Sequence, residues 1–392
     1  MIKTLEGIKV VSFTKAAAGI SCAKILAEYG AEVYFIEPVT GAPLRKMNYR
    51  EFYMNGLRSM PINLRDPKGM ELLHKLLAKS DVFISNYRAK ALKAMGLDSE
   101  TLKEKYPRLV HATVTGYGEH GPLKDAPGLD ITAFWARAGL INDVMERGSS
   151  PMIAPAGMGD TDAGFHLAMG VVSALFNREK TGEGMKVYIS LYSLGLYLNH
   201  AQIIDQEFGK VYPKTRKDPG RALKNSFHCS DGWIQTMVLD FNKHFNSLLK
   251  VIHREDLIGD PRWTCIQDTE GEKAIELTEI LDEAFAKLTV EEASKGFEEV
   301  DMAYSAYYTG LQATQDEQAA ANQFFADVIN KNGETVRIPC SPLKFGDDTP
   351  ADMSHTDQIG ESTVSIMKEY GYSDEEIEQM INDNVVASMR GL

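Results

Sequence analysis

Two apolar runs, Ile8-Lys9-Val10-Val11-Ser12-Phe13 and Ala31-Glu32-Val33-Tyr34-Phe35-Ile36, decide the fold of this chain. Between them, a turn of small residues at Ala16–Gly19 leads into a stretch with helical periodicity, which Gly30 ends. A strand, a helix and a second strand in this order form a βαβ unit, the start of a parallel sheet. The turn lacks the G-x-G-x-x-G pattern, so we expect no nicotinamide cofactor.

The alternation of strands and helices continues along the first half of the chain. Further predicted elements are helices over 67–79, 89–95 and 99–106 and strands over 81–85, 109–115 and 185–191. This order is typical of a doubly wound sheet that helices cover on both faces. We therefore predict an α/β protein whose large domain contains a doubly wound, Rossmann-like parallel sheet.

A polar stretch with Pro213, Pro219 and Gly220 indicates a linker to a smaller α+β domain. Two helical stretches near the C-terminus cannot bury their apolar faces alone, so we expect them to pack back on the large domain or on a partner chain. The predicted segments are a large α/β ligand-binding and catalytic domain at 1–209, a linker at 210–224, a small α+β domain at 225–312, a return linker at 313–344 and C-terminal helices at 345–392.

Composition excludes several classes of partner. The 392 residues are 44% apolar and carry a net charge of −13, which argues against nucleic acid and anionic membranes as main partners. Residues 1–100 carry +5 and the remainder −18, and this asymmetry fits an anionic small ligand bound in the N-terminal part.

The four cysteines have no short paired spacing, so we expect neither a zinc site nor disulfides. We also expect no tightly bound cofactor. No apolar signal core and no run of 18 apolar residues are present, which predicts a cytoplasmic protein.

A glycine-rich loop, Pro155–Gly164, places Asp160 and Asp162 where an apolar helix over 165–179 begins. Unpaired backbone N–H groups and the positive helix end should keep a carboxylate there ionised and able to attack an electrophile. An Asp in front of an apolar run is also a common helix cap, and the spacing alone leaves both interpretations open.

Eight segments in order resemble the class III CoA-transferases, the family of CaiB/BaiF-type and formyl-CoA transferase-like enzymes, and their relatives the α-methylacyl-CoA racemases. The resemblance covers nearly the whole chain. Its carriers are Leu5–Val11, Gly30–Pro38, Asn63–Gly69, Asp81–Arg88, Gly116–Pro122, Pro127–Asp130, Gly159–Gly164 and Arg178–Gly184.

The resemblance implies that Asp160 is the nucleophile, which forms a mixed anhydride with the donor and then an aspartyl-CoA thioester. Gly157 and Gly159 would bring backbone N–H groups to the developing oxyanion, and Asp162 would cap the helix or face solvent. The family also implies an intertwined homodimer. Among its branches, the chain looks most similar to the transferases that act on 2-hydroxy acids such as aryl-lactates or 2-hydroxyisocaproate.

Contacts with the substrate CoA follow from the resemblance, which places the nucleotide near residues 36–38, 62–65 and 86–88. Arg side chains form bidentate contacts with phosphate, so the phosphate candidates are Arg65, Arg88, Arg45 and Lys93. The remaining expected contacts are Glu37, Ile62, Asn86, Tyr87 and Ala17, the last at a position where one branch has a Gln.

Three other functions are open to the same sequence. A racemase pairs the Asp with a His in a Gly-His-Asp segment, and this chain has Gly128-Leu129-Asp130 there. His111, inside a strand, we expect to be a structural residue with its hydrogen bonds made. A non-catalytic acyl-CoA-binding protein would need no nucleophile, and a thioester hydrolase is disfavoured because G-x-S-x-G is absent.

Overall fold

The computed structural model describes residues 3–346 and 355–389, which form two compact units. The first unit consists of the chain up to Leu140, residues Ile153–Ile203 and the chain from Glu317 onward. The second consists of Ile141–Met152 and Ile204–Asp316. Part of the predicted C-terminal segment, 347–354 and 390–392, lies outside the described residues. The predicted domain boundaries stay a prediction.

The first unit is built on a six-stranded parallel sheet in the order β3-β2-β1-β4-β5-β6, which confirms the predicted α/β class. Its strands are β1 Lys9–Phe13, β2 Glu32–Glu37, β3 Leu57–Pro61, β4 Val82–Ser85, β5 Val110–Thr115 and β6 Lys186–Ser190. The sequence did not predict β3, because Leu57-Arg58-Ser59-Met60-Pro61 mixes polar residues with a proline and forms a strand only by pairing with β2.

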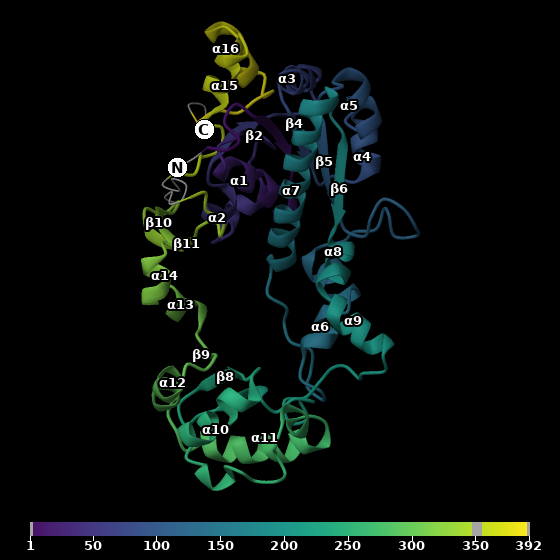
Figure 1. Cartoon of the computed structure of the whole chain (residues 1–392). Helices are drawn as coiled ribbons and strands as arrows, with labels where there is room; N and C mark the ends of the chain where they lie inside the picture. Colours follow the sequence, from purple (N-terminus) through teal and green to yellow (C-terminus); the bar gives the residue numbers. More distant parts are fainter. Residues whose placement is uncertain (1–2, 347–354, 390–392) are drawn as a thin grey trace. The chain divides into compact units, whose positions relative to one another are not determined.

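Helices cover both faces of this sheet. Helices α1 and α7 pack against each other on one face (Figure 1). On the other, apolar residues of α3, α4, α5, α15 and α16 share a core with Val11, Tyr34 and Phe83 of the strands. The helical segments of the unit are α1 Ala17–Glu28, η1 Pro43–Lys46, α2 Arg50–Met54, α3 Pro67–Leu77, α4 Ala89–Ala94, α5 Ser99–Lys105, η2 Asp130–Arg137, α6 Leu140–Val144, α7 Met158–Thr181, α8 Leu191–Leu198, α9 His200–Glu207, α14 Glu317–Ala321, α15 Thr363–Glu369 and α16 Asp374–Asn382. Of these, α6 and α9 continue into residues of the second unit.

The strand order reverses between β1 and β4, so the connections leave the carboxyl ends of these two strands in opposite directions. Ligands of open α/β sheets bind in the crevice that this reversal creates. Asn86, directly after β4, fastens the two strand ends together: its Oδ1 accepts from the Lys15 N–H at 3.0 Å and its Nδ2 donates to the Ala16 carbonyl at 3.0 Å.

The second unit has its own core around an antiparallel sheet, β7-β8-β9. Its elements are β7 Lys224–His228, β8 Trp233–Met237, α10 Phe241–Val251, η3 Glu255–Leu257, η4 Ile266–Thr269, α11 Glu272–Phe285, α12 Val290–Glu299, β9 Tyr304–Ala306 and α13 Gly310–Ala313. The predicted return linker contains α14 and a hairpin of β10 Phe325–Ile329 and β11 Thr335–Pro339. Among residues 3–346 and 355–389, no helix is long and apolar enough to span a membrane.

Candidate active site

Helix α7 begins at Met158, seven residues earlier than the apolar periodicity indicates, and this places both acidic residues inside the helix. Its N-cap is Gly157, whose φ of 80° lies in the left-handed region that favours glycine. Asp160 lies in the first turn. Asp162 is further along and its carboxylate lies 3.5 Å from Nδ1 of His166. Neither residue is therefore the helix cap.

The carboxylate that caps α7 comes from Asp130, at the start of the π-helical segment η2. Its Oδ2 accepts the Gly157 N–H at 2.7 Å and its Oδ1 the Gly159 N–H at 3.0 Å. A Cβ at position 159 would lie 2.5 Å from Oδ1 of Asp130 and 2.4 Å from Phe134, so only glycine fits. This differs from the sequence-based expectation that both N–H groups face an oxyanion, because here Asp130 occupies them.

Asp160 is a carboxylate with an unusual environment. Burial, and then the negative charge of Asp130, raise the pKa of Asp160 to about 7. Burial therefore opposes the effect of the helix end, and the expectation that the helix end keeps this side chain ionised stays a prediction. Within the residues that the structure describes, no hydrogen bond or ion pair holds its carboxylate. It is therefore a desolvated, basic carboxylate that is free to react.

Tyr53 of α2 supports the loop that carries Asp160. Its hydroxyl lies 3.1 Å from Oγ1 of Thr161 and is close enough to Gly157 that a side chain there would collide with it. Burial raises the pKa of Tyr53, so it stays a neutral phenol. Asp130 and Tyr53 together fix the start of α7.

A cavity of about 690 Å³ lies at the carboxyl ends of β1, β4 and β5, where the strand order reverses. Asp160 lines it. Six basic side chains line it as well: Lys15, Arg88, Lys90, Lys93, Lys124 and Lys186. The arrangement brings an unpaired carboxylate and several cations into one space, which suits a large anionic substrate with an electrophilic centre.

Four of the predicted CoA contacts, Asn86, Tyr87, Arg88 and Lys93, line this cavity. Asn86 is already engaged in joining β1 to β4. The ring of Tyr87 stacks on Phe13, with centroids 4.1 Å apart. Arg88 and Lys93 place cationic groups at the cavity wall. Sequence analysis did not single out the other four basic residues that line the cavity.

The other five predicted contacts are not among the described residues that line the cavity. Arg45 is buried, where it forms a two-pronged ion pair with Glu37 at 2.6 and 2.7 Å. Ile62 is buried in the core, Arg65 is exposed, and Ala17 is the first residue of α1, between two alanines that do line the cavity. The sequence could not show that Arg45 has a buried partner, because Glu37 is eight residues away at the end of a strand.

Two residues at the cavity were missed by sequence reasoning. His111 and Thr113 of β5 are buried and line the cavity, yet their side-chain polar atoms have no hydrogen-bond partner in the described part of the chain. The expectation of a structural histidine with its hydrogen bonds made is therefore wrong. Side chains two residues apart on a strand point to the same face of the sheet. This alternation along β5, which ends at the cavity, is the sequence signal that would have identified both residues.

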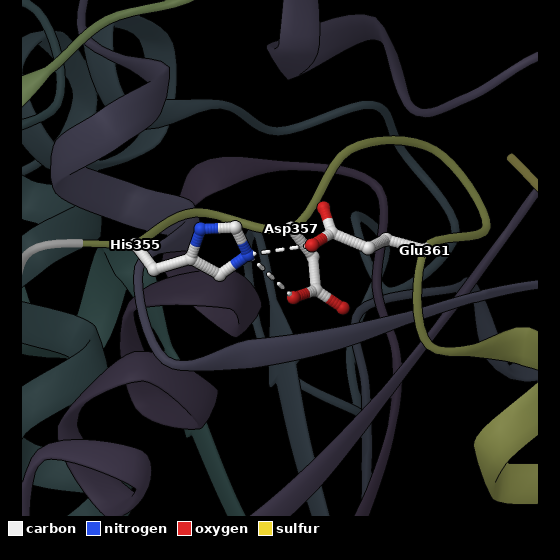
Figure 2. A group of neighbouring side chains, drawn as sticks. All are labelled: His355, Asp357 and Glu361. Atoms are coloured by element: carbon white, nitrogen blue, oxygen red, sulfur yellow. Dashed lines mark ion pairs between the residues drawn. The ribbon is translucent and has the colours of Figure 1, made fainter.

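His355, Asp357 and Glu361 form the group of described side chains that could hold a metal ion (Figure 2). Nε2 of His355 lies 2.8 Å from the Glu361 carboxylate and 3.4 Å from that of Asp357. The Asp357 carbonyl also accepts a hydrogen bond from Arg45 at 2.8 Å, which ties this segment to the sheet. None of these residues is among those described as lining the cavity, so we give the group no part in the chemistry there. The predicted absence of a metal stays a prediction.

Comparison with known proteins decides the family. The model of CoA-transferase family III matches residues 5–361. The chain belongs to CoA-transferase family III. This CoA-transferase is 35% identical to the (R)-2-hydroxy-4-methylpentanoate CoA-transferase of Clostridioides difficile, over 97% of this chain and 99% of that protein. It is 34% identical to the cinnamoyl-CoA:phenyllactate CoA-transferase of Clostridium sporogenes, over 96% of each.

Solved structures share the fold of this CoA-transferase. The crystal structure of a CAIB/BAIF family protein from Brucella suis matches with a TM-score of 0.81 at 23% identity, over 93% of this chain and 99% of that one. In the CoA-transferase described here, Leu129 stands at the cavity where a racemase would need a proton-carrying histidine.

Proposed function

We propose that this CoA-transferase moves CoA between an acyl-CoA thioester and a free carboxylic acid through a thioester formed on Asp160. The position of the Asp160 carboxylate supports the proposal most directly. It lies in the first turn of α7, it lines the cavity, and burial makes it a stronger base than an ordinary aspartate. Such a group attacks a thioester without a metal or a redox cofactor.

In the first half of the reaction, a carboxylate oxygen of Asp160 attacks the thioester carbonyl of the donor. The C–S bond breaks, CoA leaves as a thiolate, and an acyl-aspartyl anhydride forms. The thiolate then attacks the aspartyl carbonyl carbon. The anhydride C–O bond breaks, the donor acid leaves as a carboxylate, and CoA is bound to Asp160 as a thioester.

The acceptor acid reverses these steps. Its carboxylate attacks the aspartyl thioester and expels the CoA thiolate, which then attacks the acceptor's acyl carbon and restores the Asp160 carboxylate. Protons balance throughout, because each attacking group is an anion and each leaving group is one. The ordered loop that Asp130 and Tyr53 support keeps the nucleophile in place during both halves.

The cationic cavity wall supports the placement of CoA. Arg88 and Lys93 follow β4 at the point where the strand order reverses, and both face the cavity. We assign the CoA phosphates to these two residues, with Lys15 and Lys124 at the same wall. The assignment of Arg65 to phosphate stays a prediction. That of Arg45 does too, and its buried ion pair with Glu37 favours a structural role instead.

We propose 2-hydroxy acids as the acid substrates. The relatives at 34% and 35% identity are named for phenyllactate and for (R)-2-hydroxy-4-methylpentanoate, and each matches almost the full chain. Turnover with 2-hydroxyisocaproate or phenyllactate, but not with carnitine, oxalate or formate, is the expected result of an acceptor panel. Transfer confined to oxalate or formate would contradict the assignment.

An intertwined homodimer is part of the proposal. Met169, Val172 and Phe176 form an exposed apolar strip along α7, and such a strip on a long helix suits burial against a second copy. Light scattering should give the mass of two chains. The cytoplasmic location predicted from the sequence stays a prediction.

The covalent intermediate is tested by trapping. The protein is incubated with an acyl-CoA donor and then with hydroxylamine, and the peptide that contains Asp160 is examined by mass spectrometry. A hydroxamate on Asp160 is expected in the wild type and in Asp162→Asn, and none in Asp160→Asn. CoA exchange at a normal rate without any modified peptide would refute the mechanism, and acid release without an acceptor would indicate a hydrolase.

A further inference from the structure

The segment before α15 brings one imidazole and two carboxylates together, away from the residues described as lining the cavity. His355, Asp357 and Glu361 each contribute one ligand atom to a common space, and these three atoms all lie within 4.8 Å of one another. Figure 2 shows that both dashed ion pairs end on the same ring nitrogen, Nε2 of His355. An imidazole nitrogen with carboxylate oxygens is a donor set that suits Zn²⁺ and similar divalent transition-metal ions.

Other contacts already hold the two carboxylates in place. Oδ2 of Asp357 accepts the Ser59 N–H of β3 at 2.9 Å and also the Ser362 hydroxyl. Oε2 of Glu361 accepts the Gln358 N–H at 2.7 Å. Each carboxylate therefore directs its second oxygen, Oδ1 of Asp357 and Oε1 of Glu361, toward the imidazole. Two ligand atoms are thus oriented before any ion binds.

The negative charges in this space exceed the positive charge that the chain supplies. Nε2 of His355 carries one proton at most, so it can donate to one carboxylate, and a protonated ring balances only one of the two negative charges. Among the described residues, no Lys or Arg is ion-paired with either carboxylate. Arg45 reaches the Asp357 carbonyl, and its own charge is balanced by Glu37. A divalent cation balances both carboxylates.

The spacing of the ligand atoms suits a single ion. Atoms that bind one zinc ion at roughly 2.0–2.2 Å lie about 3.0–3.6 Å from each other. Nε2 of His355 lies 2.8 Å from Oε1 of Glu361 and 3.4 Å from Oδ1 of Asp357. The His355 side chain is 63% exposed, so it is free to make the small adjustment that an ion requires.

We propose that His355, Asp357 and Glu361 bind a divalent transition-metal ion of the Zn²⁺ type, with water as the remaining ligand. This departs from the sequence-based expectation of no metal, which rested on the spacing of the cysteines. The ion fastens residues 355–361 to the sheet, because Asp357 is bonded to Ser59 and to Arg45. Its role is structural and separate from the chemistry at Asp160.

Calorimetric titration with Zn²⁺ tests the site in the full-length protein after treatment with a chelator. His355→Gln and Glu361→Gln should each raise the Kd at least about tenfold, since even the loss of a partner behind a metal ligand costs about 10- to 100-fold in affinity. His166→Gln is the matched control, because His166 lies beside a single carboxylate, that of Asp162 at 3.5 Å. Its Kd should equal that of the wild type, and an equal Kd in all four proteins would overturn the inference.

Thermal melts separate a metal site from an ordinary ion pair. Zn²⁺ should raise the melting temperature of the wild type and of His166→Gln by mass action, and it should leave those of His355→Gln and Glu361→Gln unchanged. Without metal, His355→Gln should melt like the wild type, because the side chain is exposed. No response to Zn²⁺ in the wild type would mean that the three residues form only an ion pair, and would overturn the inference.

The class and the position of the ion can be checked separately. Mg²⁺ prefers oxygen ligands and gives up its waters reluctantly, so it should not raise the melting temperature, and a rise equal to that with Zn²⁺ would overturn the assignment to a transition metal. Anomalous diffraction from a zinc-soaked crystal should place the ion at His355, and a peak only elsewhere would overturn the site. None of these measurements requires turnover, so their outcome is independent of the covalent mechanism at Asp160.

Discussion

Replacing Asp160 by Asn should abolish transfer and at the same time stabilise the folded protein above pH 7. The pKa of Asp160 is about 7 in the folded state, against an ordinary value of 3.8. A difference of about 3 pH units corresponds to roughly 4 kcal/mol of unfavourable interaction with the ionised form, at about 1.4 kcal/mol per unit. Asn has nearly the same shape and no charge, so it should remove this penalty.

The sign follows from the proton balance. The folded protein binds a proton at Asp160 as the pH falls through about 7, whereas the unfolded chain binds it only near 4. The wild type therefore loses stability as the pH rises from about 4 to about 7, and Asp160→Asn does not. The advantage of the variant should be about 4 kcal/mol at pH 8 and roughly 2 kcal/mol at pH 5.

Urea denaturation of wild type and Asp160→Asn at pH 5 and pH 8 measures this difference. Asp162→Asn, which changes an equivalent carboxylate one half-turn away, is the control and should show no such gain. A variant that is no more stable than the wild type at pH 8, or a gain of equal size at both pH values, would show that burial does not destabilise the Asp160 carboxylate.

Three further predictions concern neighbouring residues. Asp130→Asn should move the acid limb of the kcat/KM–pH profile below its wild-type position, because one contribution that raises the pKa of Asp160 is lost; an unmoved limb would contradict the coupling of the two carboxylates. Arg88→Ala should raise the KM for acyl-CoA about tenfold or more and leave the melting temperature unchanged. Arg45→Ala should instead cost about 3–5 kcal/mol of stability, as removal of one partner from a buried ion pair does, and equal KM effects of the two Arg variants would refute this division of roles.

The first βαβ unit could be predicted from the sequence because Val10–Phe13 and Val33–Ile36 are continuous apolar runs, as expected for strands buried on both faces. The edge strand β3 could not, since its residues are held by pairing with β2 rather than by their own propensity. The composition of a strand can be read from its own residues, whereas its pairing depends on residues elsewhere in the chain.

The candidate nucleophile was identified by resemblance, but its environment was not. Asp130 caps the helix that carries Asp160 from 30 positions upstream. Burial and then the charge of Asp130 raise the pKa of Asp160. Likewise, the ion pair of Arg45 with Glu37 could not be seen in the sequence. Such partners are brought together only by the tertiary fold, so no spacing rule reveals them.

The β-bridge between Ile62 and Val386, with a hydrogen bond from the Asn63 N–H to the Val385 carbonyl, has a consequence for biosynthesis. Strands β1 and β2, formed from the first residues translated, share their core with Ile366 and Met380, which lie between 329 and 371 residues later in the chain. That core cannot close until the chain has emerged from the ribosome at least as far as Val386. Nascent chains must therefore keep the apolar faces of β1 and β2 exposed for most of synthesis, and this makes the early sheet a natural client for a chaperone.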